Sequence, residues 1–491
     1  MGTMRYLKIE TNFIVKVISI IVGVLNILLI SNIFAAYVMV FVEIATLLFL
    51  FFRKKYTDYM GYFLIFYTLS MEFSGFVGTT QFYNFKNTTI GGLNLGIWFT
   101  LPLFVVFLFN TKYVFNGSKI ILKAKSFFIK YSLILCMAVF MGLITILVND
   151  NNVQYFPNLF STFLGEFYTS FYMSTVVFSI LIYLKCIGRF DLSKTINFIV
   201  AIIYGVIAQV LISHVLGIRG FYAGVETLMS STIAFIIPLF PVILIYYFMN
   251  NQHGIKVHLI SIALSFYCLF LSLISNANGK LIILTILCPF CIYYVINKSI
   301  KLGWIVFLPL IPILLFFILN IIESNLSESI LLHSKVNQVL SLFDFTGRSW
   351  FGDMASSPRF RVAEFTSIVY EYMEKPWYIL FGKGILGTIK DYTNSFGSSY
   401  VLGTYSEKEW AIGSFYNMHF APASFLLWSG LFGMYFYITT VVSNLKLSRN
   451  SALLLVGTVW LAIYFGYSAT LTAFGSTVLM CGYFEIEKDY V

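Results

Sequence analysis

The sequence predicts an all-α polytopic membrane protein with about fourteen transmembrane helices and one large outward-facing (periplasmic) loop that contains short helices. Hydrophobic residues make up 59% of the chain and charged residues 11%, which lies outside the range of soluble globular proteins. Apolar runs of about 20 residues recur, and each is long enough to cross a hydrocarbon core of about 30 Å. The runs are continuous, whereas a transmembrane β-barrel would show alternating segments of about ten residues.

Hydropathy locates each span to within about four residues at either end. The spans are predicted near residues 13–31, 33–52, 59–79, 93–109, 131–148, 165–185, 196–215, 228–249, 257–275, 281–297, 303–322, 420–443, 451–469 and 471–484. Arg5 and Lys8 precede the first span, but no small-residue cleavage site follows it. This pattern is typical of a retained signal anchor.

The distribution of Lys and Arg residues predicts the orientation. If the N-terminus is cytoplasmic, the short outside loops hold only Lys86, Arg219 and Lys280. The inside loops hold many more cations, namely Arg53, Lys54, Lys55, Lys112 through Lys130, Lys185, Arg189, Lys194, Lys298, Lys301, Lys446 and Arg449. This positive-inside bias favours an even number of spans with both termini cytoplasmic. The net charge of +10 therefore reflects orientation and does not indicate a nucleic-acid partner.

Three regions follow from this topology. Residues 1–322 are expected to form a membrane helix bundle of about eleven spans, residues 323–419 a large periplasmic or extracellular loop, and residues 420–491 the C-terminal spans with a short cytoplasmic tail. An amphipathic stretch in the loop predicts a helix that lies on the membrane or on the bundle. Its apolar residues share one helical face: Val362, Phe365, Ile368, Val369 and Tyr372.

Cations on the outside are scarce, so each one is a candidate ligand for an anionic group. Arg219 lies in a short outside loop, and Arg361 begins the amphipathic stretch. The planar donor fork of Arg can hold a diphosphate in a low-dielectric site without a metal. The alternative is that such cations only reach lipid headgroups. His419, at the outer end of a span, suits a general base or a hydrogen-bond donor, or else only an interfacial polar tip.

Other patterns limit the chemistry. The six cysteines lie in or beside apolar runs and none lies in the long loop, so no disulfide framework is expected. Residues 382–387 match GxGxxG, but a helix and Pro376 precede them instead of a strand, so no dinucleotide site is expected. The chain has no DxD, HExxH, GxSxG or Walker pattern. Metal catalysis and ATP hydrolysis therefore have no support, and no cofactor is predicted.

Two motifs of the long loop carry a resemblance to a known family. The first is Arg361-Val-Ala-Glu-Phe365, followed by Pro376 and Phe381-Gly-Lys-Gly384. The second is His419, followed by Gly430-Leu-Phe-Gly433. Together they resemble the outer-loop signatures of the bacterial O-antigen polymerase and O-antigen ligase family.

Two further segments are similar to motifs of this family. Arg219-Gly-Phe-Tyr-Ala-Gly224 is similar to its Arg-x-x-Gly outer loop, and Asn278-Gly279-Lys280 stands where Ser-Arg-Gly is usual. The four motifs span roughly residues 200–440 in the family's order. Three departures hint at a divergent substrate: Val225-Glu226-Thr227 instead of Asn-Pro-Asn, Lys280 instead of Arg, and Phe420 instead of Asn.

The resemblance implies a polymerase of polyprenyl-diphosphate-linked repeat units that acts at the outer face of the bacterial inner membrane. Arg219 and Arg361, helped by Lys280, would bind the donor diphosphate, and His419 would accept or orient the acceptor hydroxyl proton. Further candidates for sugar or phosphate contact are Arg359, Arg348 and Glu226. The implied partners are undecaprenyl-diphosphate-linked oligosaccharide, membrane lipids and a chain-length regulator protein.

Two alternatives remain open at this stage. A ligase, which moves finished glycan to lipid A core or to a protein, shares all four motifs. A flippase or other transporter of lipid-linked oligosaccharide belongs to another class and would line a central cavity with charges inside its spans. Intramembrane charges are few here, with Glu72 the clearest, so the sequence favours a transferase.

Overall fold

The computed structural model describes residues 13–29, 32–71, 83–116, 122–156, 158–222, 225–249, 259–275, 279–297, 356–396 and 405–488. By the length and composition of its helices, the chain is a multi-pass helical membrane protein. Of the described helices, 7 are long and apolar enough to cross a membrane: Ile33–Phe52, Lys123–Leu147, Leu159–Cys186, Leu192–Val215, Thr232–Met249, Gly279–Asn297 and Ala421–Asn450. Shorter apolar helices accompany them: Phe13–Leu28, Leu95–Phe109, Leu259–Ser275 and Ala452–Tyr464.

The first described elements are helical: α1 (Phe13–Leu28), α2 (Ile33–Phe52), α3 (Tyr56–Leu69), α4 (Leu95–Phe109), α5 (Thr111–Asn116), α6 (Leu122–Leu147), η2 (Asp150–Tyr155), α7 (Leu159–Phe167), η3 (Tyr168–Tyr172), α8 (Met173–Cys186) and α9 (Leu192–Val215). The later helices are η4 (Thr232–Leu239), α10 (Phe240–Met249), α11 (Leu259–Ser275), α12 (Gly279–Asn297), α17 (Ser356–Glu374), α18 (Tyr378–Phe381), α19 (Glu407–Ile412), α20 (Ala421–Leu447), η8 (Ser448–Asn450), α21 (Ala452–Tyr464) and α22 (Ala469–Lys488). Two antiparallel hairpins complete the described elements: β1 (Thr89–Ile90) with β2 (Leu93–Asn94), and β3 (Arg219–Tyr222) with β4 (Val225–Leu228).

Every predicted span except 303–322 overlaps one of these helices, and 303–322 lies outside the described residues. The total of about fourteen spans stays a prediction. The two hairpins depart from the all-α expectation. Between β1 and β2, Gly91 and Gly92 have φ angles of 59° and 80°, the left-handed geometry that a tight hairpin turn requires.

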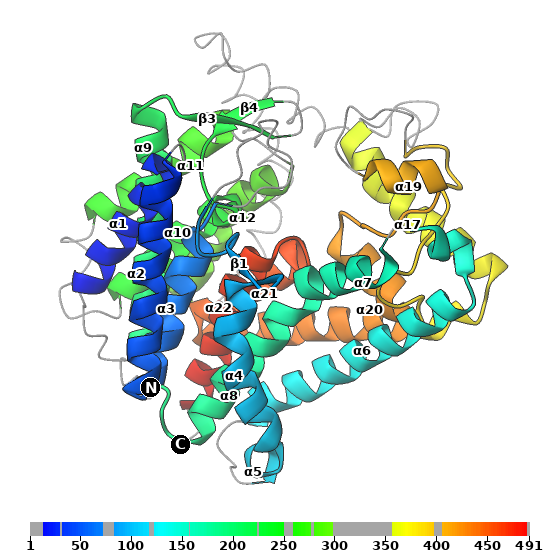
Figure 1. Cartoon of the computed structure of the whole chain (residues 1–491), viewed down its shortest axis with the longest axis horizontal. Coiled ribbons are helices and arrows are strands. Elements are labelled where there is room, and N and C mark those ends of the chain that lie inside the picture. Colours follow the sequence, from blue (N-terminus) through cyan, green and yellow to red (C-terminus); the bar gives the residue numbers. More distant parts are fainter. Residues whose placement is uncertain are drawn as a thin grey trace.

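α22 lies in the middle of the bundle (Figure 1) and packs against α3, α6, α8, α9 and α21. Its residues from Ala469 to Glu487 are all buried. Small residues allow this close packing, because a Cβ on Gly475 would lie 2.0 Å from the Trp460 ring, and one on Gly482 would lie 2.3 Å from the Leu454 nitrogen. The predicted span 471–484 is therefore the inner part of a longer, buried helix.

The described residues 356–396 and 405–420, called the cap below, have a small hydrophobic core of their own against the first part of α20. This core contains Phe360, Ala363, Ile368, Tyr372, Tyr378, Ile389, Phe396, Tyr405, Phe415, Ala423, Leu426 and Leu427. The cap is thus a packed unit and not only a connection between spans. The domain boundaries at 322 and 419 stay predictions.

The cap helix α17 corrects the single apolar face that the sequence predicts. Ile368 and Tyr372 are buried in the cap core, whereas Phe365 and Val369 are 37% and 40% exposed. The inward face instead repeats at helical spacing through small and acidic residues, including Glu364 and Glu371. These acids form hydrogen bonds inside the cap, and the bonds offset the free-energy cost of burying a carboxylate. A hydropathy pattern does not include this compensation.

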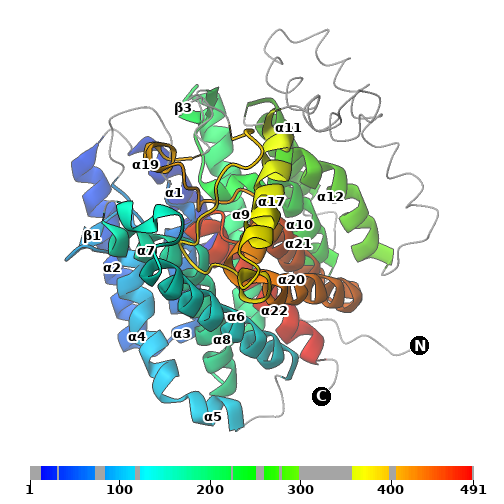
Figure 2. The same ribbon diagram turned by 90° about the vertical axis from the view of Figure 1, so that its right-hand side faces the viewer.

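The hairpin β3–β4 and the cap helices α17 and α19 lie toward one end of the molecule, and α5 lies toward the opposite end (Figures 1 and 2). α5 contains Lys112, one of the cations predicted to face the cytoplasm. Candidate site residues on α17 and β3 therefore lie toward the end opposite to this cation.

Candidate functional site

His419 and Glu364 form the central contact of the candidate site. Nδ1 of His419 lies 2.6 Å from Oε1 of Glu364. The backbone N–H of His419 also donates to both Glu364 oxygens, at 3.2 and 3.1 Å. The Glu364 side chain is fully buried, whereas that of His419 is 27% exposed. Glu364 therefore fixes one ring nitrogen of His419, and the opposite nitrogen, Nε2, is left for chemistry.

Tyr405 supports this pair through the same carboxylate oxygen that His419 Nδ1 contacts. Its hydroxyl donates to Oε1 of Glu364 at 3.1 Å, and its ring lies 5.3 Å from the His419 ring. Burial and the Glu364 carboxylate raise the pKa of Tyr405 well above its ordinary value, so the phenol stays a hydrogen-bond donor. The Glu364 carboxylate is thus held by His419, which lies just before α20, and by Tyr405, which lies just before α19.

Two basic residues, Arg361 and Lys280, lie near the pair. Arg361 lies three residues before Glu364 on α17, which is one helical turn. Lys280, at the start of α12, interacts electrostatically with both Arg361 and Glu364. Its Nζ lies 4.3 Å from the ring centre of Tyr467 and 5.2 Å from that of Tyr464. Of the predicted site residues, His419 contacts the buried Glu364 carboxylate directly, and Arg361 and Lys280 lie near it.

The remaining predicted residues are placed as follows. Arg219 is exposed on β3, and its Nη1 lies 3.5 Å from Oγ of Ser275, at the end of α11. Arg219 therefore lies near the end of α11, the helix that precedes Lys280 in the chain. Arg359 is half-buried on α17. Glu226 belongs to β4, but its side chain and the whole of Arg348 lie outside the described structure.

The two glycine motifs contact each other directly. α20 is broken at Ser429 and Gly430, where Gly430 has φ 57°. A Cβ on Gly382 would lie 2.5 Å from the Ser429 nitrogen, and one on Gly430 would lie 2.6 Å from the Gly382 nitrogen. The break in α20 frees backbone carbonyls, and Lys383 N–H donates to that of Leu427 at 2.7 Å. The glycines thus allow backbone-to-backbone contact between the two motifs.

The turn Gly382-Lys383-Gly384 also packs against α6. A Cβ on Gly384 would lie 1.9 Å from the nitrogen of Gly142, and one on Gly142 would lie 2.4 Å from the Ile385 oxygen. The N–H of Ile385 donates to the carbonyl of Ala138 at 2.9 Å. Because these partners are in the spans Lys123–Leu147 and Ala421–Asn450, the turn is wedged between two membrane helices.

A buried ion-pair cluster anchors this turn to α17. Nζ of Lys383, itself fully buried, lies 2.6 Å from Oδ2 of Asp150 and 3.0 Å from Oε1 of Glu371. Nζ of Lys375 bonds Glu371 at 2.7 Å and also contacts Asp150. Asn151 completes the cluster by donating to Glu371 at 2.9 Å. Lys383 therefore serves the fold of the turn and does not face a ligand.

The two lysines stabilise the charged forms of both acids in this cluster. Burial by itself would raise the pKa of Asp150 and Glu371, but the ammonium groups of Lys383 and Lys375 outweigh it and hold both carboxyl pKa values below their ordinary range. Above a pH of about 4, the pKa of a carboxyl group in the unfolded chain, both acids therefore stabilise the folded protein. This stabilisation is lost as the pH falls through their lower pKa values in the folded protein.

Replacing Lys383 with Met is expected to destabilise the folded protein by about 3–5 kcal/mol, because it removes the fully buried cation of the cluster and leaves Asp150 and Glu371 to share Lys375. The measurement is the midpoint of thermal unfolding of purified protein in detergent. Lys390→Met is the matched control, since Lys390 is exposed in the same loop. An equal midpoint for both variants would contradict a structural role for the cluster.

The sequence analysis missed Glu364, Tyr405 and the ion-pair cluster. Glu364 and Glu371 stand seven residues apart, two helical turns, and that spacing was a signal that both acids share the inward face of α17. Their partners give no local signal, because they come from distant segments. Within the described residues no group of three or more His, Cys, Asp or Glu side chains is arranged to hold a metal.

No protein-family model, curated protein or solved structure matches this chain. The site must therefore be interpreted from its own chemistry. It holds a histidine oriented by a buried carboxylate, next to an arginine and a lysine, at the rim of a helix bundle. Such a group is suited to removing a proton from a hydroxyl while stabilising negative charge on a leaving group.

Proposed function

We propose that this protein is a polymerase that joins polyprenyl-diphosphate-linked oligosaccharide repeat units into O-antigen, capsule or a related surface polysaccharide. The reaction is a metal-independent glycosyl transfer on the outer face of the bacterial inner membrane. The observation that carries the proposal is the 2.6 Å contact between His419 and buried Glu364, with Arg361 and Lys280 beside it. It joins an oriented base to two cations, as transfer from a diphosphate donor to a hydroxyl requires.

The glycine contacts support the same proposal. The Gly-Lys-Gly turn belongs to the first resemblance motif and Gly430 to the second, and the two pack backbone to backbone. Segments that look like two separate signatures in the sequence are thus one structural unit. This unit places α17, with Arg361 and Glu364, next to the start of α20, with His419.

The chemical step follows from these groups. The acceptor hydroxyl oxygen bonds to the anomeric carbon as the bond from that carbon to the diphosphate oxygen breaks. Nε2 of His419 takes the hydroxyl proton, and Glu364 stabilises the resulting imidazolium. The diphosphate leaves with the bonding electrons, and Arg361 and Lys280, helped by Arg219 of β3, stabilise its charge.

The proposal includes the finer topology predicted from the sequence. About fourteen spans place both termini in the cytoplasm and the cap in the periplasm. The position of α5 toward the end opposite to the cap supports this orientation, since α5 carries Lys112. A lipid-linked substrate would approach the cap from the outer leaflet, where a chain-length regulator would also act.

Gene deletion separates the proposed polymerase from its alternatives. Loss of a polymerase leaves single repeat units attached to the acceptor, and loss of a ligase leaves no glycan attached. Loss of a transporter leaves repeat units on the cytoplasmic side of the membrane. Gel analysis of surface glycan and of lipid-linked repeat units in the deletion strain distinguishes the three, and either of the last two results would refute the polymerase.

Replacing Arg361 with Ala is expected to remove the long-chain glycan ladder, because losing one charge-stabilising donor costs about 10²–10³-fold in rate. Surface glycan is compared on gels after complementation of the deletion strain at equal membrane levels. Arg449→Ala is the control, since Arg449 is exposed and distant from the cap in the chain. A normal ladder from Arg361→Ala would exclude Arg361 from the reaction.

A further inference from the structure

A second polar feature lies away from the cap, between α1 and α2. Glu43 lies near the middle of the span Ile33–Phe52 and is 3% exposed. Neither of its carboxyl oxygens has a hydrogen-bond partner among the described residues. An ionisable group at this depth is costly unless it is neutralised or serves a function. The sequence analysis passed over Glu43 and named Glu72, which lies outside the described residues.

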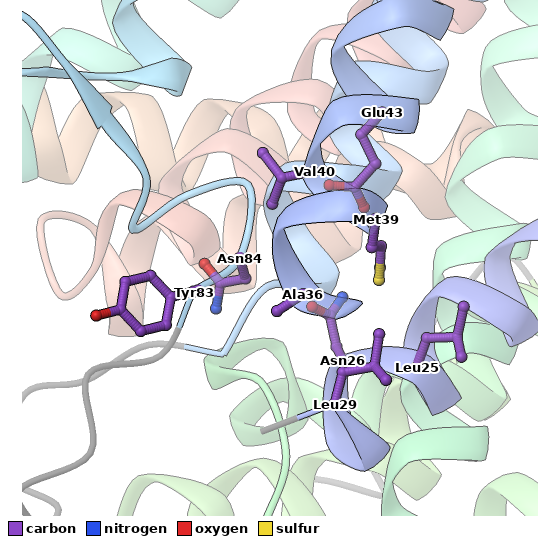
Figure 3. Close-up of a pocket in the computed structure, with 9 residues that line it drawn as sticks. All are labelled: Leu25, Asn26, Leu29, Ala36, Met39, Val40, Glu43, Tyr83 and Asn84. Atoms are coloured by element: carbon purple, nitrogen blue, oxygen red, sulfur yellow. The ribbon is translucent and has the colours of Figure 1, made fainter. Parts of the chain in front are cut away.

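Glu43 lines a pocket that also contains polar groups from two other segments. Asn26 of α1 faces the same space as Glu43, with Tyr83 and Asn84 at its side (Figure 3). The Asn26 amide nitrogen is buried and has no partner in the described structure. The other lining residues are apolar: Leu25, Leu29, Ala36, Met39 and Val40.

The size and charge of the pocket limit its occupant. The space has room for about one water molecule or an ion of similar size, which excludes a sugar or a lipid headgroup. No basic residue is among those that line it, and Tyr83 is the one other titratable lining group. Lys86 follows in the same loop but does not line the pocket. Two tyrosines of α3, Tyr56 and Tyr59, contact α2 at Phe51, which lies eight residues after Glu43 in the chain.

We propose that Glu43 and Asn26 form a monovalent-cation site within the membrane, which takes up a proton or Na⁺. A bare carboxylate in this apolar space would be strongly disfavoured, so a single positive charge must accompany it. A proton would make Glu43 a neutral acid. Na⁺ would be held by the carboxylate and by amide oxygens, which suit a hard cation.

The site has a structural consequence. Among the described elements, α2 packs mainly on α3, and many of its side chains are exposed. Release of the bound cation would leave an uncompensated charge between α1 and α2. The position of α2 would then depend on whether the site is occupied. This inference does not depend on the proposed glycan chemistry, which uses other elements.

The test uses dicyclohexylcarbodiimide, a hydrophobic reagent that modifies protonated carboxyl groups in apolar surroundings. The full-length protein is labelled in membranes at neutral pH, in NaCl or in choline chloride at equal ionic strength, and Glu43 is followed by peptide mass spectrometry. Glu43→Gln is the control for specificity, and exposed Glu374 is the internal control, expected to stay unlabelled. Thermal unfolding of Glu43→Gln in choline chloride is measured in parallel.

Labelling of Glu43 in both salts supports the site with a proton as occupant. Labelling in choline chloride that is lost in NaCl supports Na⁺ as the competing occupant. Glu43→Gln should lose the label and unfold at the native midpoint or above, because Gln is a neutral isostere. An absence of labelling in both salts, or a lower midpoint for Glu43→Gln, would overturn the proposal.

Discussion

Replacing His419 with Ala is expected to lower the rate of glycosyl transfer by about 10²–10⁴-fold, the contribution of a positioned general base. Replacing Glu364 with Gln is expected to have an effect of similar size. Gln keeps the shape of the side chain and still accepts the His419 backbone N–H. Its amide group, however, donates where the carboxylate accepted, which favours the wrong tautomer of the imidazole.

A double variant tests whether the two residues act as one unit. If Glu364 works only through His419, then Glu364→Gln combined with His419→Ala should be no slower than His419→Ala by itself. The measurements are the surface-glycan ladder in cells and the polymerisation rate of purified protein with lipid-linked repeat units. If the native protein and Glu364→Gln have equal thermal stability, a lower rate of the variant reflects catalysis and not misfolding. A full ladder from Glu364→Gln would rule out the proposed pairing.

Replacing Gly384 with Ala is expected to prevent folding, or to cost more than about 4 kcal/mol, because two penalties act together. The φ angle of 80° is disfavoured for any residue with a side chain. The new Cβ would also lie 1.9 Å from the backbone nitrogen of Gly142, and a backbone atom in a packed helix cannot move away cheaply. The measurement is the yield of monodisperse protein in detergent together with its thermal midpoint.

Gly142→Ala separates these two penalties. Gly142 has an ordinary helical backbone, so alanine would by itself favour the helix. Its Cβ would lie 2.4 Å from the Ile385 oxygen, so any loss of stability must come from the contact between α6 and the turn. Gly165→Ala is the control, since no atom lies within 4 Å of its added Cβ. Native-like stability of Gly142→Ala would show that the turn is not wedged against α6.

The helices could be predicted from the sequence because crossing a hydrocarbon core depends on local composition. The run of residues in α9, for example, is apolar regardless of which helices pack against it. The scarcity of cations on the predicted outer side selected Arg361 and Lys280 as candidates, and the position of His419 at the end of a span selected that residue. The burial of α22 could not be predicted in this way, since small residues such as Gly475 are favourable only where another helix covers them.

Which side chains of the candidate site contact each other is visible only in the tertiary structure. The burial of Glu364 depends on donors from His419 and Tyr405, which are far away in the chain. The close contact that requires glycine at Gly384 comes from α6. Composition determined which helices are apolar and long enough to cross a membrane. The fold decided which of them meet, because contacts between distant segments leave no local pattern.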